Sequence, residues 1–270
     1  MEIPLSDGNK LRNLQRVDMS SNSFTGHIQA SIFSQPALQY LDLRYNHLSG
    51  HIEEFQKPST MLEEIYLSNN KLNGTIPTSF SQLSALTKLE LGSNNFLGTL
   101  DLYPYLMLRN LSVIRASNNP LLSVSAEDHD DGSNNSSIID TLELASCGLT
   151  RVPSVLKYLP KLNYHDLSNN SIHGNIPDWI WRNKTFLYLQ HNLFTKVGQL
   201  PAYTFIDSYM SSTSATINSG ALCRSLTQGR NLDWLKFNYT SHGLSSLSQY
   251  TKAAIRFTNR GSRRRGAGMP

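Results

Sequence analysis

Residues 67–77 read Leu-Ser-Asn-Asn-Lys-Leu-Asn-Gly-Thr-Ile-Pro, and variants of this phrase recur along the first two hundred residues. Aligning the second Asn of the phrase gives a ladder whose first three steps are 24 residues and whose later steps are 25, 28, 23 and 22. The ladder positions are Asn22, Asn46, Asn70, Asn94, Asn119, Cys147, Asn170 and Asn192. We number the coils one to eight after them. A phrase that keeps its register over so many units predicts a repeat protein.

Apolar residues stand at fixed distances from each ladder position. Three residues before it are Met19, Leu43, Leu67, Leu91, Ala116, Leu144, Leu167 and Leu189. Five residues before it are Val17, Leu41, Ile65, Leu89, Ile114, Leu142, His165 and Leu187. Two residues after it are Phe24, Leu48, Leu72, Phe96, Leu121, Leu149, Ile172 and Phe194. Residues two apart on a strand point to the same face, so each coil presents an apolar face that only stacking on its neighbours can bury.

The ladder residue follows this short strand, where the chain turns away. An Asn amide there can bond main-chain groups that the bend leaves unpaired. The consensus of such repeats accepts Cys at this position, so Cys147 is expected to be a buried free thiol. His165 occupies a core column, and we expect a tolerated substitution with local strain or a hydrogen-bonded partner.

The full phrase resembles the plant extracellular class of leucine-rich repeats. Within that class, residues 142–181 are similar to plant receptor-like proteins of the disease-resistance type. The residues that carry this likeness are 144–149 (Leu-Ala-Ser-Cys-Gly-Leu), 152–153 (Val-Pro), 167–170 (Leu-Ser-Asn-Asn), 172–177 (Ile-His-Gly-Asn-Ile-Pro) and 179–181 (Trp-Ile-Trp). The resemblance implies an α/β-type solenoid, a leucine-rich-repeat superhelix with a parallel β-sheet on its concave face and little helix. It covers about residues 3–200.

The same resemblance implies a receptor at the plasma membrane that lacks its own kinase and signals through a partner receptor kinase. The family begins with a signal peptide and a capping segment and ends with a membrane-spanning helix. This sequence begins inside a repeat at Ile3-Pro4, without the basic and apolar regions of a signal peptide, and has no apolar run of about 18 residues. We therefore expect uncapped ends, and an internal fragment or an incomplete gene model.

Charge divides the chain into two parts. Of its 24 Lys/Arg and 20 Asp/Glu residues, 9 basic but only 2 acidic ones lie after residue 200. We expect a solenoid over residues 1–200 and a basic segment of low order over 201–270, either disordered or mispredicted. The run Arg263-Arg264-Arg265 can suggest nucleic acid, but without a folded platform we disfavour that interpretation.

Ligands of this fold usually meet the residues that alternate with the buried ones. The candidate ligand-binding residues are Arg16, Asp18, Tyr40, Asp42, Arg44, Glu64, Tyr66, Lys88, Glu90, Arg115, Glu143, Tyr164, Asp166 and Tyr188. Aromatic anchors among charges suit a peptide, glycan or protein partner. For the acidic positions we favour the simpler interpretation that each Asp belongs to the repeat phrase and only keeps the outward side of its strand in contact with water.

Two further patterns concern the surface. Residues 125–133 contain an acidic cluster, but the order of ligands in an EF-hand is not met, so we expect a solvated loop and no metal. Asn-x-Ser/Thr sites, which suit a secreted glycoprotein, occur at Asn73, Asn110, Asn134, Asn135, Asn169, Asn183 and Asn238.

No hydrolase, zinc-protease, P-loop or dinucleotide-binding motif is present, so we expect neither an enzyme nor a cofactor. The resulting hypothesis is a ligand-binding part of a receptor-like protein in defence or developmental signalling. The alternatives are a soluble inhibitor of a secreted polygalacturonase, part of a receptor-kinase ectodomain, or a truncated product without function.

Overall fold

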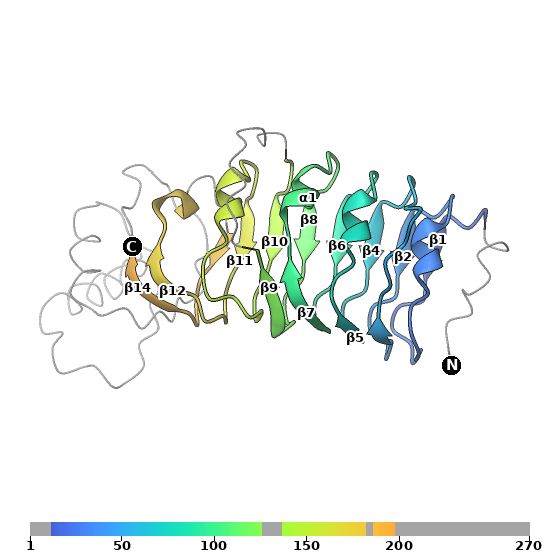
Figure 1. Cartoon of the computed structure of the whole chain (residues 1–270), viewed down its shortest axis with the longest axis horizontal. Helices are drawn as coiled ribbons and strands as arrows, with labels where there is room; N and C mark the ends of the chain where they lie inside the picture. Colours follow the sequence, from blue (N-terminus) through green and yellow to red (C-terminus); the bar gives the residue numbers. More distant parts are fainter. Residues whose placement is uncertain (1–11, 126–136, 182–185, 198–270) are drawn as a thin grey trace, which may run out of the picture.

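The computed structural model describes residues 12–125, 137–181 and 186–197, which form a solenoid of stacked coils (Figure 1). One strand from each coil joins an eight-stranded parallel sheet in the order β1-β2-β4-β6-β8-β10-β11-β13, here called the long sheet. Its strands are β1 (Arg16–Asp18), β2 (Tyr40–Asp42), β4 (Glu64–Tyr66), β6 (Lys88–Glu90), β8 (Val113–Arg115), β10 (Thr141–Glu143), β11 (Tyr164–Asp166) and β13 (Phe186–Tyr188). Equivalent residues of neighbouring coils pair directly, as Leu41 does with Ile65. The predicted leucine-rich-repeat solenoid is confirmed.

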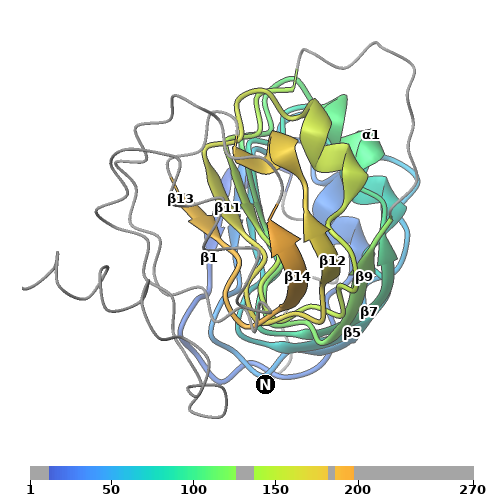
Figure 2. The ribbon, with the colours of Figure 1, turned by 90° about the vertical axis from the view of Figure 1, so that its left-hand side faces the viewer.

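Smaller sheets and short helices form the rest of each coil. β3 (Ser49–His51), β5 (Lys71–Gly74), β7 (Asn95–Leu100) and β9 (Leu121–Val124) make a four-stranded parallel sheet, and β12 (His173–Ile176) pairs with β14 (Leu193–Val197). The helical turns are η1 (Ala30–Ser34), η2 (Thr78–Gln82), α1 (Tyr103–Leu106), η3 (Ser154–Tyr158) and η4 (Asp178–Trp181). Seen end-on, the long sheet and the helical turns lie on opposite sides of the core (Figure 2).

The core lies between these layers and contains the predicted apolar columns. Leu41, Leu67, Leu91 and Leu144 are at most 1% exposed, and His165 is also fully buried, between Leu142 and Leu187 of the neighbouring strands. One assignment was wrong. Leu121 is 68% exposed, whereas Leu122 is fully buried in its place. After Asn119 the buried apolar residue therefore stands three residues beyond the ladder position instead of two. The Leu122 amide donates to the Asn119 carbonyl oxygen at this point.

The ladder residues connect successive coils. In coil four, Nδ2 of Asn94 donates to the carbonyl oxygens of Leu67, Leu91 and Gly92, and its Oδ1 accepts the Leu72 amide at 3.0 Å. Asn46, Asn70, Asn119, Asn170 and Asn192 bond in the same way, each accepting an amide of the coil before it. The amide of the ladder Asn thus satisfies polar groups of two coils at once.

Cys147 takes the ladder position of coil six as a buried free thiol, as expected. Its Sγ lies 3.4 Å from the Ala116 carbonyl oxygen, and burial raises the pKa of the thiol to about 11. A thiol that stays protonated in this way is a poor nucleophile.

The residue before each ladder position has a positive φ. These residues are Ser21, Tyr45, Asn69, Ser93, Asn118, Ser146, Asn169 and His191, with φ between 52° and 61°. Only glycine adopts this conformation without cost, and Asn tolerates it better than bulky residues do. The sequence analysis did not predict this repeated bend.

Gly74 is expected to be the least replaceable of the glycines that follow the ladder. Its φ is +75°, and a Cβ atom there would lie 2.8 Å from Cβ of His51, whereas Gly174 has a φ of +90° and nothing within 4 Å. Gly174→Ala should cost about 1–2 kcal/mol of unfolding free energy from the backbone conformation alone. Gly74→Ala should cost clearly more, as measured by urea unfolding. Equal costs would show that His51 moves aside freely.

Several predictions concern residues outside the described ranges. These are the loop at 125–133 beyond Ser125, the sites Asn134, Asn135, Asn183 and Asn238, Ile3-Pro4, and the segment 201–270. Among the residues that are described, no helix is long and apolar enough to cross a bilayer.

Candidate ligand-binding face

The outward face of the long sheet carries every candidate ligand-binding residue. Thirteen lie on its strands at the positions that alternate with the buried residues, and Arg44 follows β2 by two residues. The side chains differ in exposure, because Asp42 is 1%, Tyr66 7% and Glu90 8% exposed, whereas the side chain of Arg16 is 61% exposed. The face therefore consists of accessible groups and of groups that their neighbours already cover.

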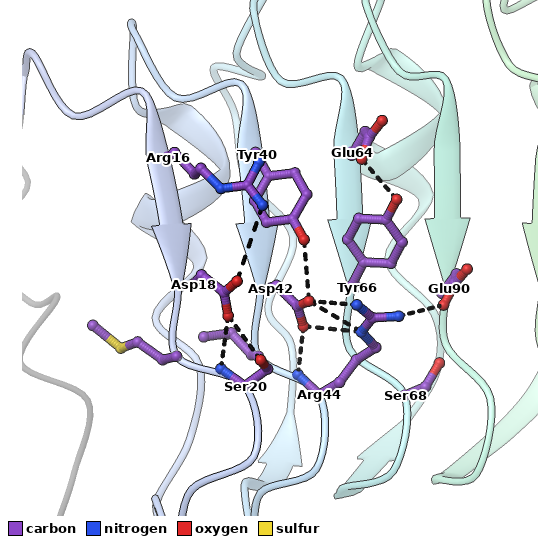
Figure 3. Close-up of polar contacts among 12 residues, drawn as sticks. Arg16, Asp18, Ser20, Tyr40, Asp42, Arg44, Glu64, Tyr66, Ser68 and Glu90 are labelled. Carbon is purple, nitrogen blue, oxygen red and sulfur yellow. Dashed lines mark hydrogen bonds and ion pairs between the residues drawn. The ribbon is translucent and has the colours of Figure 1, made fainter.

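In coils one and two, arginine stacks on tyrosine (Figure 3). The guanidinium carbon of Arg16 lies 3.4 Å from the ring centroid of Tyr40, within the range of a cation–π interaction. Arg16 also lies 4.0 Å from the carboxylate of Asp18, and the Tyr40 hydroxyl donates to Oδ2 of Asp42 at 3.2 Å.

Arg44 occupies the centre of a second such group (Figure 3). Its Nε and Nη2 donate to the Asp42 carboxylate, Nη2 at 2.6 Å, and Nη1 lies 3.5 Å from Oε2 of Glu90. The guanidinium carbon lies 4.4 Å from the ring centroid of Tyr66. A fork-shaped cation that pairs with a carboxylate and stacks on a ring uses the geometry in which arginine differs from lysine.

Ion pairs continue through the middle coils. Lys88 lies 3.2 Å from Glu64, and Arg115 bridges Glu90 of the preceding coil and Glu143 of the following coil. The interpretation that the acidic positions only solvate their strands is therefore wrong at Asp42 and Glu90, which are buried against arginines.

Coils seven and eight present aromatic rings instead. The ring centroid of Tyr164 lies 5.6 Å from that of Phe186 and 5.4 Å from that of Tyr188. Burial raises the pKa of the Tyr164 hydroxyl to about 12, and the Tyr188 hydroxyl, Glu143 and Asp166 add to the shift. Within the described ranges, no arginine or lysine stacks on these three rings.

The carboxylates of this face predict that the stability of the fold decreases in acid. Hydrogen bonds from the Ser20 side chain and backbone hold the pKa of Asp18 below 3.8. Burial raises the pKa of Glu64, but hydrogen bonds from Tyr66 and Lys88 outweigh it and leave the pKa below 4.5. The folded-state pKa values of both carboxyl groups are depressed. Their contribution to the free energy of unfolding is therefore complete above about pH 4.5 and is lost as the pH falls through the folded-state values.

The urea midpoint is accordingly expected to stay level from pH 7 to about pH 5 and to fall at lower pH. Glu64→Gln should reduce this fall, because one of the coupled carboxylates no longer titrates. A Glu64→Gln protein with an unchanged pH profile would show that its ion pair with Lys88 contributes nothing.

Comparison with known proteins agrees with this architecture. A family model described as Leucine Rich Repeat matches residues 13–34, 37–57 and 61–83. Receptor like protein 27 of Arabidopsis thaliana is 37% identical over 98 residues, which are 36% of this chain and 12% of that protein. Receptor like protein 22 of Arabidopsis thaliana is 35% identical over 122 residues, 44% of this chain and 15% of that protein. The chain has the leucine-rich-repeat fold and is similar, over part of its length, to plant receptor-like proteins.

Solved structures extend the likeness of this leucine-rich-repeat protein to ectodomains. The Arabidopsis receptor kinase HAESA, in complex with the peptide hormone IDA and the co-receptor SERK1, has a TM-score of 0.64 and 28% identity. That likeness covers 74% of this chain and 33% of the HAESA chain in that structure. The plant peptide hormone receptor RGFR1, in complex with RGF2, has a TM-score of 0.63 and 30% identity, over 72% of this chain and 31% of that receptor. The chain thus spans about a third of these ectodomains.

The remaining predicted sites of the leucine-rich-repeat protein are surface positions. Asn73, Asn110 and Asn169 are exposed, so their side chains are accessible to modification. The Asn169 side chain donates to the Ser146 hydroxyl at 2.6 Å. In the described part of the chain, no three His, Cys, Asp or Glu side chains are grouped as metal ligands.

Proposed function

We propose that the outward face of the long sheet binds a peptide or protein ligand, and that the chain belongs to the ligand-binding part of a cell-surface receptor-like protein. Its role would lie in defence or developmental signalling, through a partner receptor kinase. A glycan is the other ligand class that aromatic anchors suit. The proposal is one of binding and not of catalysis.

The observation that carries this proposal is the long sheet itself. It presents rows of aromatic and charged side chains on eight strands in direct register, on a surface that the helical turns leave open. Two structural relatives with this architecture, HAESA and RGFR1, are in complex with peptide hormones. Tyrosine and arginine are also the side chains most enriched at binding hot spots.

A displayed library of random peptides, selected on the full chain, tests the proposal. Val113 lies half-buried on the outward face of β8, and Val113→Arg adds bulk there without removing an ion pair. Asn95→Arg adds the same side chain at an exposed position of β7, on the four-stranded sheet.

Selected peptides should bind the unaltered protein and the Asn95→Arg variant equally. They should lose at least about tenfold in affinity for Val113→Arg or for an equivalent outward-face variant. If every selected peptide tolerates all outward-face variants, the long sheet is not the binding surface.

A receptor-kinase ectodomain is the second candidate, because HAESA is a receptor kinase. Sequencing the full transcript separates the two candidates. A downstream kinase domain would favour the receptor kinase, and a membrane-spanning helix without a kinase would favour the receptor-like protein.

A further inference from the structure

Coils two and seven carry the same outward side chains with one difference. Coil two reads Tyr40-Leu41-Asp42-Leu43-Arg44, and coil seven reads Tyr164-His165-Asp166-Leu167-Ser168. In both, the aspartate pairs in register with a tyrosine of the next coil, Asp42 with Tyr66 and Asp166 with Tyr188. Coil two therefore serves as an internal template in which only Arg44 has no counterpart.

In the template, the arginine completes the group. The Arg44 guanidinium bonds Asp42 through two nitrogens, lies over the Tyr66 ring and leaves the Asp42 side chain 2% exposed (Figure 3). The carboxylate of Asp42 thus has its charge neutralised and its oxygens bonded.

In coil seven the corresponding groups have fewer partners. Asp166 accepts the Ser168 amide at 2.9 Å, as Asp42 accepts the Arg44 amide at 3.0 Å. Asp166 forms no ion pair with any described residue, and no described cation lies over Tyr188. Asp166 is also half-buried where Asp42 is almost completely covered. The serine side chain is too short to take the place of a guanidinium.

A second observation concerns Gln190, which follows Ser168 in the same column of the next coil. Their backbones are adjacent, since the Asn169 amide donates to the Gln190 carbonyl oxygen at 2.9 Å. The side-chain oxygen of Gln190 is buried and accepts no hydrogen bond from the described residues. A buried acceptor without a donor is costly, so a turn of the half-buried Gln190 side chain toward an N–H group that a ligand brings would be favourable.

We propose that Tyr164, Asp166, Ser168 and Tyr188, here called the coil-seven site, bind the guanidinium of an arginine side chain that the ligand supplies. This guanidinium takes the place that Arg44 has in coil two, paired with Asp166 and stacked on Tyr188. The inference rests on the proposed function and specifies the chemistry of its ligand. Arginine is preferred over lysine because its planar fork can pair with a carboxylate and lie on a ring at the same time.

The probe for the test is Nα-acetyl-arginine methylamide, and the uncharged isostere Nα-acetyl-citrulline methylamide is its control. Tyrosine ring signals of the isotope-labelled full chain report binding by NMR. The arginine probe should shift the Tyr164 and Tyr188 signals and bind about tenfold more tightly than the citrulline probe. Equal binding of both probes would overturn the proposal.

Two reciprocal variants sharpen the result. Ser168→Arg should fill the coil-seven site with its own side chain and abolish the shifts of Tyr164 and Tyr188. Arg44→Ser should open the equivalent place in coil two and add a probe-dependent shift of Tyr66. Asp166→Asn keeps an acceptor for the Ser168 amide and should weaken the arginine probe about tenfold.

Selected peptides distinguish this inference from the proposed function. Peptides that carry arginine and lose affinity for Ser168→Arg support both. Peptides that lose affinity for Val113→Arg but bind Ser168→Arg unchanged would overturn the coil-seven site and leave the binding face intact. Binding that depends on neither variant contradicts the proposed function as well.

Discussion

Asn94→Ala is expected to lower the free energy of unfolding by about 4 kcal/mol, because four hydrogen bonds of a buried amide are lost together. The Asn94 side chain bonds Leu67, Leu91 and Gly92 carbonyl oxygens and the Leu72 amide, which belong to two coils. Alanine can satisfy none of them. Urea unfolding measures the loss, and hydrogen exchange of the Leu72 amide should show that it begins at the contact between coils three and four.

Asn22→Ala is the matched control. Asn22 is the ladder residue of coil one and is exposed, and among the described residues its side chain donates only to the carbonyl oxygens of Met19 and Ser20 in its own coil. Its loss should cost less than about 1 kcal/mol, since water can replace exposed hydrogen bonds. If both variants lost the same stability, the bonds between coils would contribute nothing.

Phe80→Ala should have an effect of about 3–5 kcal/mol through the apolar core. Phe80 is fully buried in η2, edge-on to Phe33 at 5.0 Å between ring centroids and 5.8 Å from Phe55. The three rings come from successive coils and contact one another, so removal of the Phe80 ring leaves a cavity beside Phe33 and Phe55. The unfolding free energy, measured in urea, reports the cost.

Phe80→Leu separates cavity formation from a special need for the ring. Leu156 stands at the equivalent place in η3 and is 2% exposed, so the fold accepts leucine there. We expect a cost below about 1.5 kcal/mol for this exchange. A leucine variant as unstable as the alanine variant would mean that ring packing, and not volume, stabilises the contact.

The sequence predicted the long sheet and its core because a repeated phrase constrains every coil in the same way. Leu41, Ile65 and Leu89 had to be equivalent, and the structure pairs them in register. The outward columns followed from the same alternation. The smaller sheets were not predicted, because Lys71–Gly74 and its equivalents carry no alternating apolar pattern that distinguishes a strand from a turn.

Other features depend on geometry that no single coil encodes. The slip from Leu121 to Leu122 follows from how the chain leaves Asn119, and both residues are leucine, so composition cannot choose between them. The burial of Asp42 and Glu90 requires arginines that arrive from their own or a neighbouring coil. Ser168 is not among the candidate residues from the sequence, because small residues such as Ser68 and Ser117 stand at the same place in other coils. Comparing its phrase with that of coil two was the signal that singles it out.

The interruption between β9 and β12 has an elastic consequence. The long sheet includes a strand from every described coil, but the four-stranded sheet ends at β9. Between β9 and β12, the described residues connect the coils on that side through the bridge between Asn119 and Cys147 and through single backbone hydrogen bonds, such as Gly148 to Leu122 and Ser171 to Leu149. A rod bonded along two sides resists flexing more than one bonded along a single side. Bending and torsion of the solenoid should therefore concentrate between coils five and seven, so that coils one to five and coils seven and eight move as two stiff blocks about the long sheet.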